Sequence, residues 1–197
     1  MSSRRLPGKV LAPFRGRPLV AHVIERVRDG LGSAPVVLVT SVHPTDDPLA
    51  AYARTLDVPV FRGPLDDVFG RFRAALDVHP CTFVMRVCCD SPLLLPTMVR
   101  DMAQIAREGA FDVVTTTHPR TFPSGQNVEV IRTRTMLAIH PGELDAHDRE
   151  HVTRFFYRHP MRFTIKNVES GDANLAEQND CVDTLDDLVR LEAVGGT

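Results

Sequence analysis

Long apolar runs are missing from this sequence. No stretch approaches the roughly 18 consecutive apolar residues of a membrane-spanning helix. The N-terminal arginines are not followed by the apolar region of a signal peptide. These two absences favour a cytoplasmic protein that does not act in a membrane.

An excess of charge of either sign is also missing. The chain has 23 Lys and Arg against 25 Asp and Glu, which gives a formal net charge of -2 at pH 7 with neutral histidines. A protein that coats nucleic acid or an anionic membrane surface is typically much more basic. We therefore expect neither nucleic acid nor membrane as a partner, while local basic sites remain open.

Cysteine is scarce, and its spacing does not suggest a metal site. The four cysteines, Cys81, Cys88, Cys89 and Cys181, form no CxxC pair and no metal-ligand spacing with histidine. Three of them lie in or beside one apolar run. We expect all four to be reduced residues of the core.

Internal repeats, low-complexity tracts and interdomain linkers are absent as well. The chain has 197 residues, of which 43% are hydrophobic, and this is enough for one domain with a substantial core. We therefore expect a single domain over residues 1–197.

The sequence does contain an alternation of helical and strand patterns. Apolar residues recur near helical spacing in 19–27 and 47–56, whereas 36–41 and 58–63 are short apolar runs typical of buried strands. Further helices are expected at 66–76, 96–107, 134–140, 150–157 and 184–194, and further strands at 81–89, 111–117, 127–133 and 162–168. This order predicts an α/β sandwich with a largely parallel sheet, whose ligands bind beyond the carboxyl ends of the strands.

The first candidate for chemistry is a basic loop near the N-terminus, RRLPGKVLAPFRGRPLV, residues 4–20. In its RLPGK segment, Gly8 allows backbone N–H groups to approach phosphate oxygens, and Arg5 and Lys9 supply the positive charge that a polyphosphate needs. It is not a Walker A motif, because GxxxxGK[ST] is absent. On these residues alone, a common surface turn is the alternative.

Two aspartates are candidate ligands of a divalent cation. Asp90 follows the most apolar strand, in VMRVCCDSPLL, where a carboxylate can hold a cation at the edge of the sheet. Asp183 precedes the last helix, in CVDTLDDL. Each also has a structural alternative: Asp90 can cap a turn, and either Asp183 or Thr184 can be the N-cap of the last helix.

In this order, the segments resemble the cytidylyltransferases of the spore coat polysaccharide biosynthesis type, which are relatives of CMP-acylneuraminate and 3-deoxy-manno-octulosonate cytidylyltransferases. The resemblance covers nearly the whole chain and rests on RRLPGKVLAPFRGRPLVAHVIERV, FRGPLDDVFGRFRAAL, VMRVCCDSPLL, SGQNVEV, REHVTRFFY and CVDTLDDLVRL. It implies a Rossmann-like nucleotide-diphosphosugar transferase fold, a three-layer α/β/α sandwich with a mixed, mostly parallel sheet. It also implies a nucleotidyltransferase that uses Mg²⁺, moves CMP from CTP to an acidic sugar or related anionic acceptor, and releases pyrophosphate.

The resemblance assigns roles to individual residues. Arg5 and Lys9 match triphosphate-binding residues that assist transfer, and Asp90 and Asp183 match magnesium ligands. The other expected nucleotide-binding residues are Ser2, Ser3, Gly8, Arg62, Gly63 and Asp67. The expected acceptor-binding residues are Asn127, Glu129 and His151. Two of these have alternatives, because Arg62 can instead pair with Asp66, and His151 can be a packing or dimer residue.

Two features depart from the family pattern. A short apolar strand normally precedes the RLPGK motif and helps to recognise the base, but only a few residues come before it here. We therefore expect the central strand of the sheet to be missing. One explanation is that the sequence starts too late, and the other is that a different segment fills the gap. The second departure is Asn127, where aspartate is common, and it suggests a different acceptor.

Two other functions remain open. Without the base-reading strand, the sequence does not exclude a nucleotidyltransferase that uses another base, such as GTP, on a sugar phosphate or cofactor precursor. A noncatalytic paralogue acting as a binding partner is the second, although the combination of Arg5, Lys9, Asp90 and Asp183 argues against it. The resemblance alone suggests a homodimer.

Overall fold

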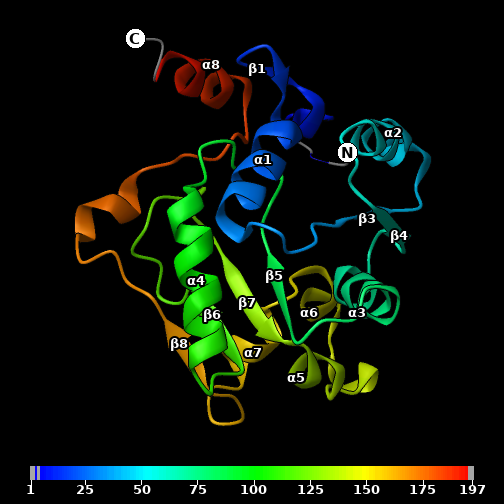
Figure 1. Cartoon of the computed structure of the whole chain (residues 1–197), viewed down its shortest axis with the longest axis vertical. Coiled ribbons are helices and arrows are strands. Elements are labelled where there is room, and N and C mark those ends of the chain that lie inside the picture. Colours follow the sequence, from blue (N-terminus) through cyan, green and yellow to red (C-terminus); the bar gives the residue numbers. More distant parts are fainter. Residues whose placement is uncertain (1–2, 4, 195–197) are drawn as a thin grey trace.

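A computed structural model describes residue 3 and residues 5–194, and it has the expected α/β architecture (Figure 1). The strands are β1 (Pro13–Phe14), β2 (Arg17–Pro18), β3 (Leu38–Ser41), β4 (Val60–Gly63), β5 (Phe83–Arg86), β6 (Val113–Thr115), β7 (Glu129–Arg132) and β8 (Ile165–Asn167). The α-helices are α1 (Leu19–Leu31), α2 (Asp47–Thr55), α3 (Val68–Val78), α4 (Pro96–Glu108), α5 (Thr133–Leu137), α6 (Ala146–Glu150), α7 (Arg154–Arg158) and α8 (Leu185–Ala193). The 3₁₀ helices are η1 (Lys9–Leu11), η2 (Pro44–Asp46), η3 (Pro141–Glu143) and η4 (Ala173–Glu177).

The strand pairings are mixed, as predicted, but the expected parallel majority is not found among the described pairs, of which β1–β2, β5–β7 and β6–β7 are antiparallel. β3 pairs with β4 in parallel, and the larger group has the order β5-β7-β6-β8. In that group β7 runs antiparallel to both β5 and β6, whereas β6 and β8 are parallel.

Helices cover both faces of the sheet, which gives three layers. In β6 the side chain of Val113 packs in one cluster of buried residues and that of Val114 in another, because consecutive side chains of a strand point to opposite faces. The Val114 cluster contains residues of α1 and α4, which lie together on one side of the sheet in Figure 1. The Val113 cluster contains residues of α3, α5 and α7. The three-layer α/β/α sandwich is therefore confirmed.

The sheet is divided between β3 and β5. The part of the chain that the structure describes places no strand between them, and an apolar cavity of about 610 Å³ lies there instead.

One expected helix is wrong. Instead of a single helix over 150–157, α6 ends at Glu150 and α7 begins at Arg154. His151 has φ -108° and ψ 89°, which is not helical, and Val152 is buried between the two helices. The sequence pattern missed this break because the burial of Val152 comes from tertiary packing.

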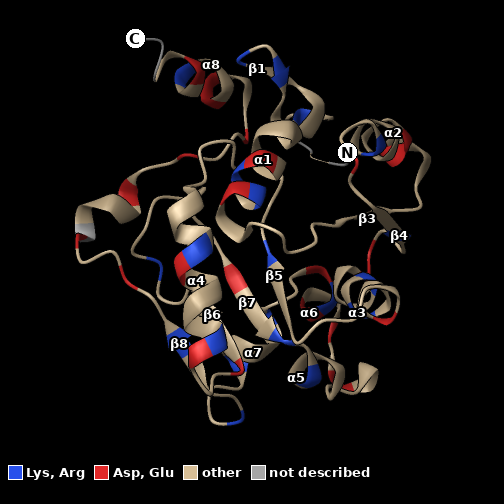
Figure 2. Ribbon diagram, viewed as in Figure 1, with Lys and Arg blue, Asp and Glu red and all other residues tan. Residues whose placement is uncertain are grey.

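The cysteines are reduced, as expected, but one of them does not lie in the core. All four cysteines are free, but Cys81 is exposed and the other three are only half-buried, so the expected core position is wrong for Cys81. Acidic and basic segments are interspersed over the described elements in Figure 2.

None of the helices in residues 3 and 5–194 has both the length and the apolar character that a membrane span needs.

Candidate active site

Residues from three distant parts of the sequence meet at one end of the sheet. The Nζ atom of Lys9 lies 2.7 Å from a carboxylate oxygen of Asp90 and 2.8 Å from one of Asp183. Arg5 contacts the second oxygen of Asp183 at 2.8 Å. These four residues, Arg5, Lys9, Asp90 and Asp183, are called the charged cluster below.

The N-terminal loop brings its two basic residues to the charged cluster through a tight turn. Gly8 has φ +75°, a left-handed conformation that residues with a Cβ rarely adopt. The N–H of Lys9 donates to the carbonyl of Leu6 at 3.1 Å, and the N–H of Leu6 donates to the Ser3 hydroxyl at 3.3 Å. Ser3 therefore supports the turn. Ser2, expected in the same loop, lies outside the described residues.

Asp90 and Asp183 do not have the structural roles that the sequence left open. The N-cap of α8 is Thr184, whose side chain accepts from the N–H of Asp187. The oxygens of Asp90 accept from Lys9 and from the Ser91 hydroxyl. The backbones of the two loops are joined, because the N–H of Val182 donates to the carbonyl of Asp90 at 2.9 Å. Both carboxylates are thus held in place but directed toward Lys9.

The electrostatics of the charged cluster keep Lys9 protonated. Its side chain is 12% exposed, and burial alone would lower the pKa of Lys9. The hydrogen bonds to Asp183 and Asp90 outweigh this effect and raise the pKa above the usual value for lysine.

The two carboxylates have the geometry of a cation site. Oxygens of Asp90 and Asp183 both lie within 2.8 Å of one positive centre, the Lys9 ammonium, which shows that they converge on the same point. Oxygen ligands of this kind suit Mg²⁺ or Mn²⁺, and such ions usually need only one or two protein carboxylates. The residues present therefore fit a divalent cation.

Three of the expected nucleotide-binding residues have contacts elsewhere. Arg62 pairs with Asp47 at 2.6 Å, not with Asp66, and also donates to the carbonyls of Ser41 and His43. A Cβ on Gly63 would lie 2.5 Å from the Arg71 side chain, so glycine is needed there for packing. Asp67 is the N-cap of α3 and pairs with Arg149 at 3.2 Å. No contact within the described residues joins these three to the charged cluster, and their role in nucleotide binding stays a prediction.

Glu129, expected to bind the acceptor, is buried in a polar network. It accepts from Arg86 at 2.5 Å and from the Tyr157 hydroxyl at 2.7 Å, and that hydroxyl also lies 2.8 Å from the hydroxyl of Thr115. Burial and the charge of Glu129 raise the pKa of Tyr157, so the phenol stays protonated as a donor. Both oxygens of Glu129 are therefore engaged by neighbours within the protein.

Sequence reasoning missed the partners in this network. Arg86 lies inside the most apolar strand, and a charged residue in such a position needs a buried partner. A buried arginine of this kind indicates an ion pair. Only the antiparallel pairing of β5 with β7, which places Arg86 opposite Glu129, identifies the partner.

The other two expected acceptor residues have different surroundings. The Oδ1 atom of Asn127 is buried without a hydrogen-bond partner in the part of the chain that is described. His151 is exposed at the end of α6, where its ring lies with His147 and Glu150 so that one ligand atom from each falls within 4.8 Å of the others. No described contact brings Asn127 or His151 to the charged cluster.

A three-layer sandwich with a basic loop facing two carboxylates agrees with the nucleotidyltransferase class of enzymes, to which the family model assigns the chain. More particularly, the chain belongs to the cytidylyltransferase family, whose model matches residues 1–187. A similar curated protein is the spore coat polysaccharide biosynthesis protein SpsF of Bacillus subtilis strain 168. It is 28% identical over 200 residues, which cover 98% of this chain and 82% of that protein.

Solved structures show the same fold. A cytidylyltransferase from Leptospira borgpetersenii has a TM-score of 0.89 at 23% identity, with 98% of this chain and 81% of that chain covered. CMP:2-keto-3-deoxy-manno-octonic acid synthetase complexed with CTP has a TM-score of 0.73 at 17% identity, with coverage of 98% and 93%. Rv0371c from Mycobacterium tuberculosis, in complex with manganese, has a TM-score of 0.63 at 20% identity, with coverage of 96% and 93%.

Proposed function

We propose that this enzyme transfers CMP from CTP to an acidic sugar or a related anionic acceptor and releases pyrophosphate, with Mg²⁺ as the cofactor. The observation that carries the proposal is the charged cluster, in which Lys9 contacts both Asp90 and Asp183. Membership of the cytidylyltransferase family supports CTP as the donor. The similarity to SpsF supports an acceptor related to polysaccharide precursors.

The chemistry of the reaction explains why these residue types are needed. An acceptor oxygen attacks the α-phosphorus of CTP, a bond forms between them, and the bond to the departing pyrophosphate breaks. Negative charge builds on the phosphoryl oxygens and on the leaving group, so positively charged groups held in place in advance lower the barrier.

In this chain Lys9 and Arg5 supply those positive charges. Lys9 is held protonated, and Arg5 is 65% exposed, so its guanidinium is accessible to a phosphate. The left-handed turn at Gly8, which has no side chain, would let the backbone of the same loop approach the phosphates. We infer that both side chains exchange their carboxylate partners for β- and γ-phosphate oxygens when nucleotide binds.

Asp90 and Asp183 would hold the divalent cation. When bound, such an ion neutralises phosphoryl charge and orients the two reacting oxygens. The connection between the backbones of Asp90 and Val182 keeps the two carboxylates at a fixed separation. A carboxylate or phosphate acceptor needs no general base from the protein.

Thermal unfolding with four nucleotides tests the proposal. With Mg²⁺ present, CTP should raise the Tm more than GTP, UTP or ATP. A ligand at about 100 times its Kd stabilises by about 2.7 kcal/mol. The Asp183→Asn variant should lose most of this shift, and Lys166→Met, which changes the exposed lysine of β8, should keep it. A larger Tm shift with GTP than with CTP would identify GTP as the donor. No Tm shift with any nucleotide would contradict the proposal.

A further inference from the structure

Helix α6 and the residue that follows it carry a group of metal-ligating side chains outside the charged cluster. His147, Glu150 and His151 are all exposed, and one ligand atom from each lies within 4.8 Å of the other two. Residues three and four positions apart lie on the same side of a helical turn, which explains why these three side chains meet. We call them the histidine cluster.

The three side chains of the histidine cluster have no hydrogen bond or ion pair among the described residues, although their charged neighbours do. Asp148 pairs with Arg154 at 2.5 Å, and Arg149 pairs with Asp67 at 3.2 Å. These nearby arginines are therefore balanced by carboxylates of the chain. The two imidazole rings and the carboxylate of the histidine cluster are available to bind a cation.

The ligand types of the histidine cluster select a different ion from that of the charged cluster. Two imidazole nitrogens and one carboxylate suit Zn²⁺, whereas Mg²⁺ prefers oxygen ligands alone. Around a tetrahedral Zn²⁺, two ligand atoms about 2.1 Å from the ion lie about 3.4 Å apart. Atoms that lie within 4.8 Å of one another need to approach by at most about 1.4 Å to reach this arrangement. Exposed side chains can do so by rotation about their own bonds.

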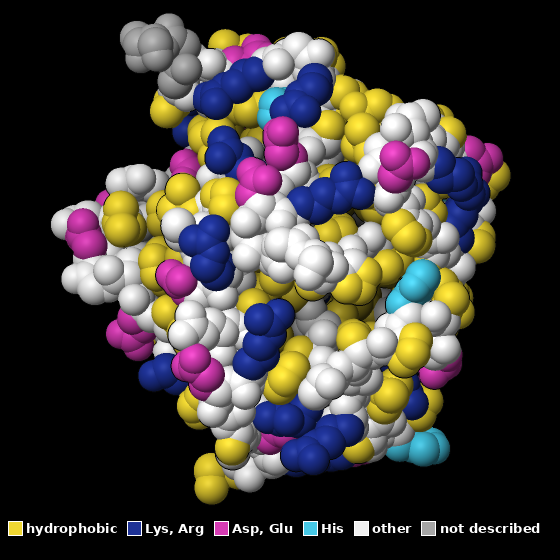
Figure 3. All heavy atoms as spheres, viewed as in Figure 1, with side chains coloured by type: hydrophobic (Ala, Val, Ile, Leu, Met, Phe, Trp, Pro, Cys, Tyr) yellow, Lys and Arg dark blue, Asp and Glu magenta, His cyan; other side chains and the backbone are white. Residues whose placement is uncertain are grey.

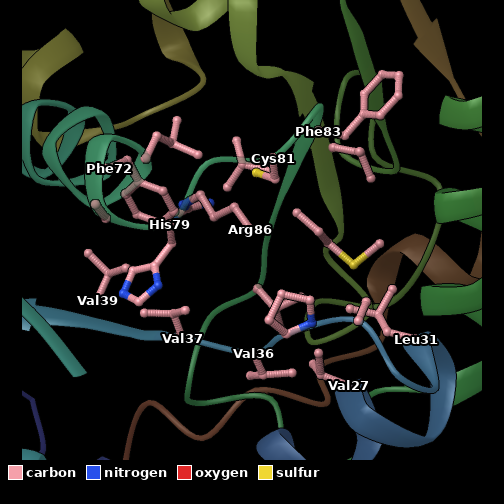
Figure 4. A pocket seen from close by; sticks show the side chains of 18 of the residues that line it. Val27, Leu31, Val36, Val37, Val39, Phe72, His79, Cys81, Phe83 and Arg86 are labelled. Carbon is pink, nitrogen blue, oxygen red and sulfur yellow. The ribbon is translucent and has the colours of Figure 1, made fainter. Parts of the chain in front are cut away.

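Other parts of the described surface offer no comparable set of ligands. On the face shown in Figure 3, histidine side chains reach the surface in a few separate places. In the apolar cavity between β3 and β5, the labelled side chains of Figure 4 include one histidine, His79, and the other polar ones are Cys81 and Arg86. Among the described residues, only the histidine cluster brings three His, Cys, Asp or Glu side chains close enough together to share an ion.

We propose that the histidine cluster binds one Zn²⁺ ion through His147, Glu150 and His151. Three protein ligands leave a further coordination position for water. The ion joins side chains across the end of α6, because His151 is the residue at which this helix ends. It stabilises a helix of five residues, which is too short to be stable without such support. This site is separate from nucleotidyl transfer and does not depend on which nucleotide the enzyme uses.

Zinc binding by the metal-free full chain, without an affinity tag, tests the proposal. Excess Mg²⁺ in the titration competes for the oxygen ligands of the charged cluster. We expect calorimetry to give one Zn²⁺ per chain, and saturating Zn²⁺ to raise the Tm by about 3 °C or more. The double variant His147→Asn, His151→Asn should bind Zn²⁺ at least about tenfold more weakly, because two of three ligands are gone. His118→Asn, which changes an exposed histidine outside the cluster, should bind Zn²⁺ as the unsubstituted chain does.

Co²⁺ in place of Zn²⁺ identifies the ligands by their absorption. Nitrogen and oxygen ligands give visible d–d bands, whereas cysteine ligands add an intense thiolate-to-cobalt charge-transfer band. We expect d–d bands without the thiolate band, and their loss in the double variant. Melting without metal shows whether that variant is folded, and Glu150→Gln, which removes the third ligand alone, should also weaken Zn²⁺ binding. No Zn²⁺ binding, equal binding in the double variant, or a thiolate band would each overturn the proposal.

Discussion

Lys9 is the residue that links the two candidate metal ligands. It lies between Asp90 and Asp183, where its ammonium group balances two carboxylates, and we propose that it moves to a phosphate when nucleotide binds. Its contacts explain why a lysine, a point charge on a long flexible stem, is suited to this position. The family resemblance predicted Lys9, Asp90 and Asp183 together as candidate site residues. The sequence could not show that Lys9 contacts both carboxylates.

Replacing Lys9 by methionine keeps much of the side-chain volume and removes the charge. We expect kcat for CTP-dependent transfer to fall about 10²- to 10³-fold, the size of effect seen when one stabilising donor is removed. The matched control is Lys166→Met, which removes the other lysine of the chain at an exposed position and should change kcat less than about twofold. Similar losses in both variants would show that the charge at Lys9 has no special role.

Asp112 gives a prediction about pH. Burial alone would raise the pKa of this carboxyl, but hydrogen bonds from Thr135 at 2.6 Å and from Thr164 at 2.8 and 2.9 Å lower it below the usual value. A lowered pKa means that the stabilisation is complete above the unfolded value of about 3.9 and is lost as the pH falls through the folded value.

Asp112→Asn should therefore lower the Tm by about 2–4 °C at pH 7, which corresponds to about 1 kcal/mol. The difference from the unsubstituted protein should shrink below about pH 4, as Asp112 becomes protonated. Thermal melts between pH 3 and 7 measure this, with Asp101→Asn in the exposed surface of α4 as control. If the Tm difference between Asp112→Asn and the unsubstituted protein grew toward low pH, the lowered pKa of Asp112 would be contradicted.

Among the elements, α8 matters because it positions Asp183. Thr184 caps the helix together with Asp187, and Leu188 and Leu191 pack against Phe14 near the N-terminal loop. The capped start of α8 therefore fixes the position of Asp183, which directly precedes Thr184. The sequence identified this helix and narrowed its N-cap to two residues, and the structure assigns Thr184.

Thr184→Ala should cost about 1 kcal/mol of stability, the typical value for loss of an N-cap, and lower the Tm by about 2–4 °C. Because the cap lies next to Asp183, the same variant should also weaken the Tm shift with CTP and Mg²⁺. Thr184→Ser keeps the hydroxyl and should restore most of both effects. If serine is no better than alanine, the hydroxyl cap does not hold this end of the helix.

The element order was predictable because each helix and strand has its own local pattern. The expected helix over 150–157 failed because its break depends on the buried Val152 and on Asp148, which pairs with Arg154 and Arg158 of the next helix. The polar network around Glu129 also escaped prediction, since Arg86, Thr115 and Tyr157 come from three different elements. Pairings between distant residues depend on strand register, and the sequence alone does not give it.

At the scale of the whole molecule, one end of a divided sheet carries the charged cluster. The three layers place the N-terminal loop, the end of β5 and the start of α8 at this end, so residues from distant parts of the sequence meet in the charged cluster. The resemblance predicted this architecture and the four residues of the charged cluster. It did not predict the engagement of Arg62 and Asp67 with Asp47 and Arg149.

The most direct test of the central claim is pyrophosphate release from CTP and Mg²⁺ with a panel of sugar acids, sugar phosphates and phosphonates. We expect release that requires CTP, a divalent cation and an anionic acceptor, and that falls at least about a hundredfold in Asp183→Asn. Release that is unchanged in that variant, or that occurs with another nucleotide but not with CTP, would contradict the proposed cytidylyl transfer at Lys9, Asp90 and Asp183.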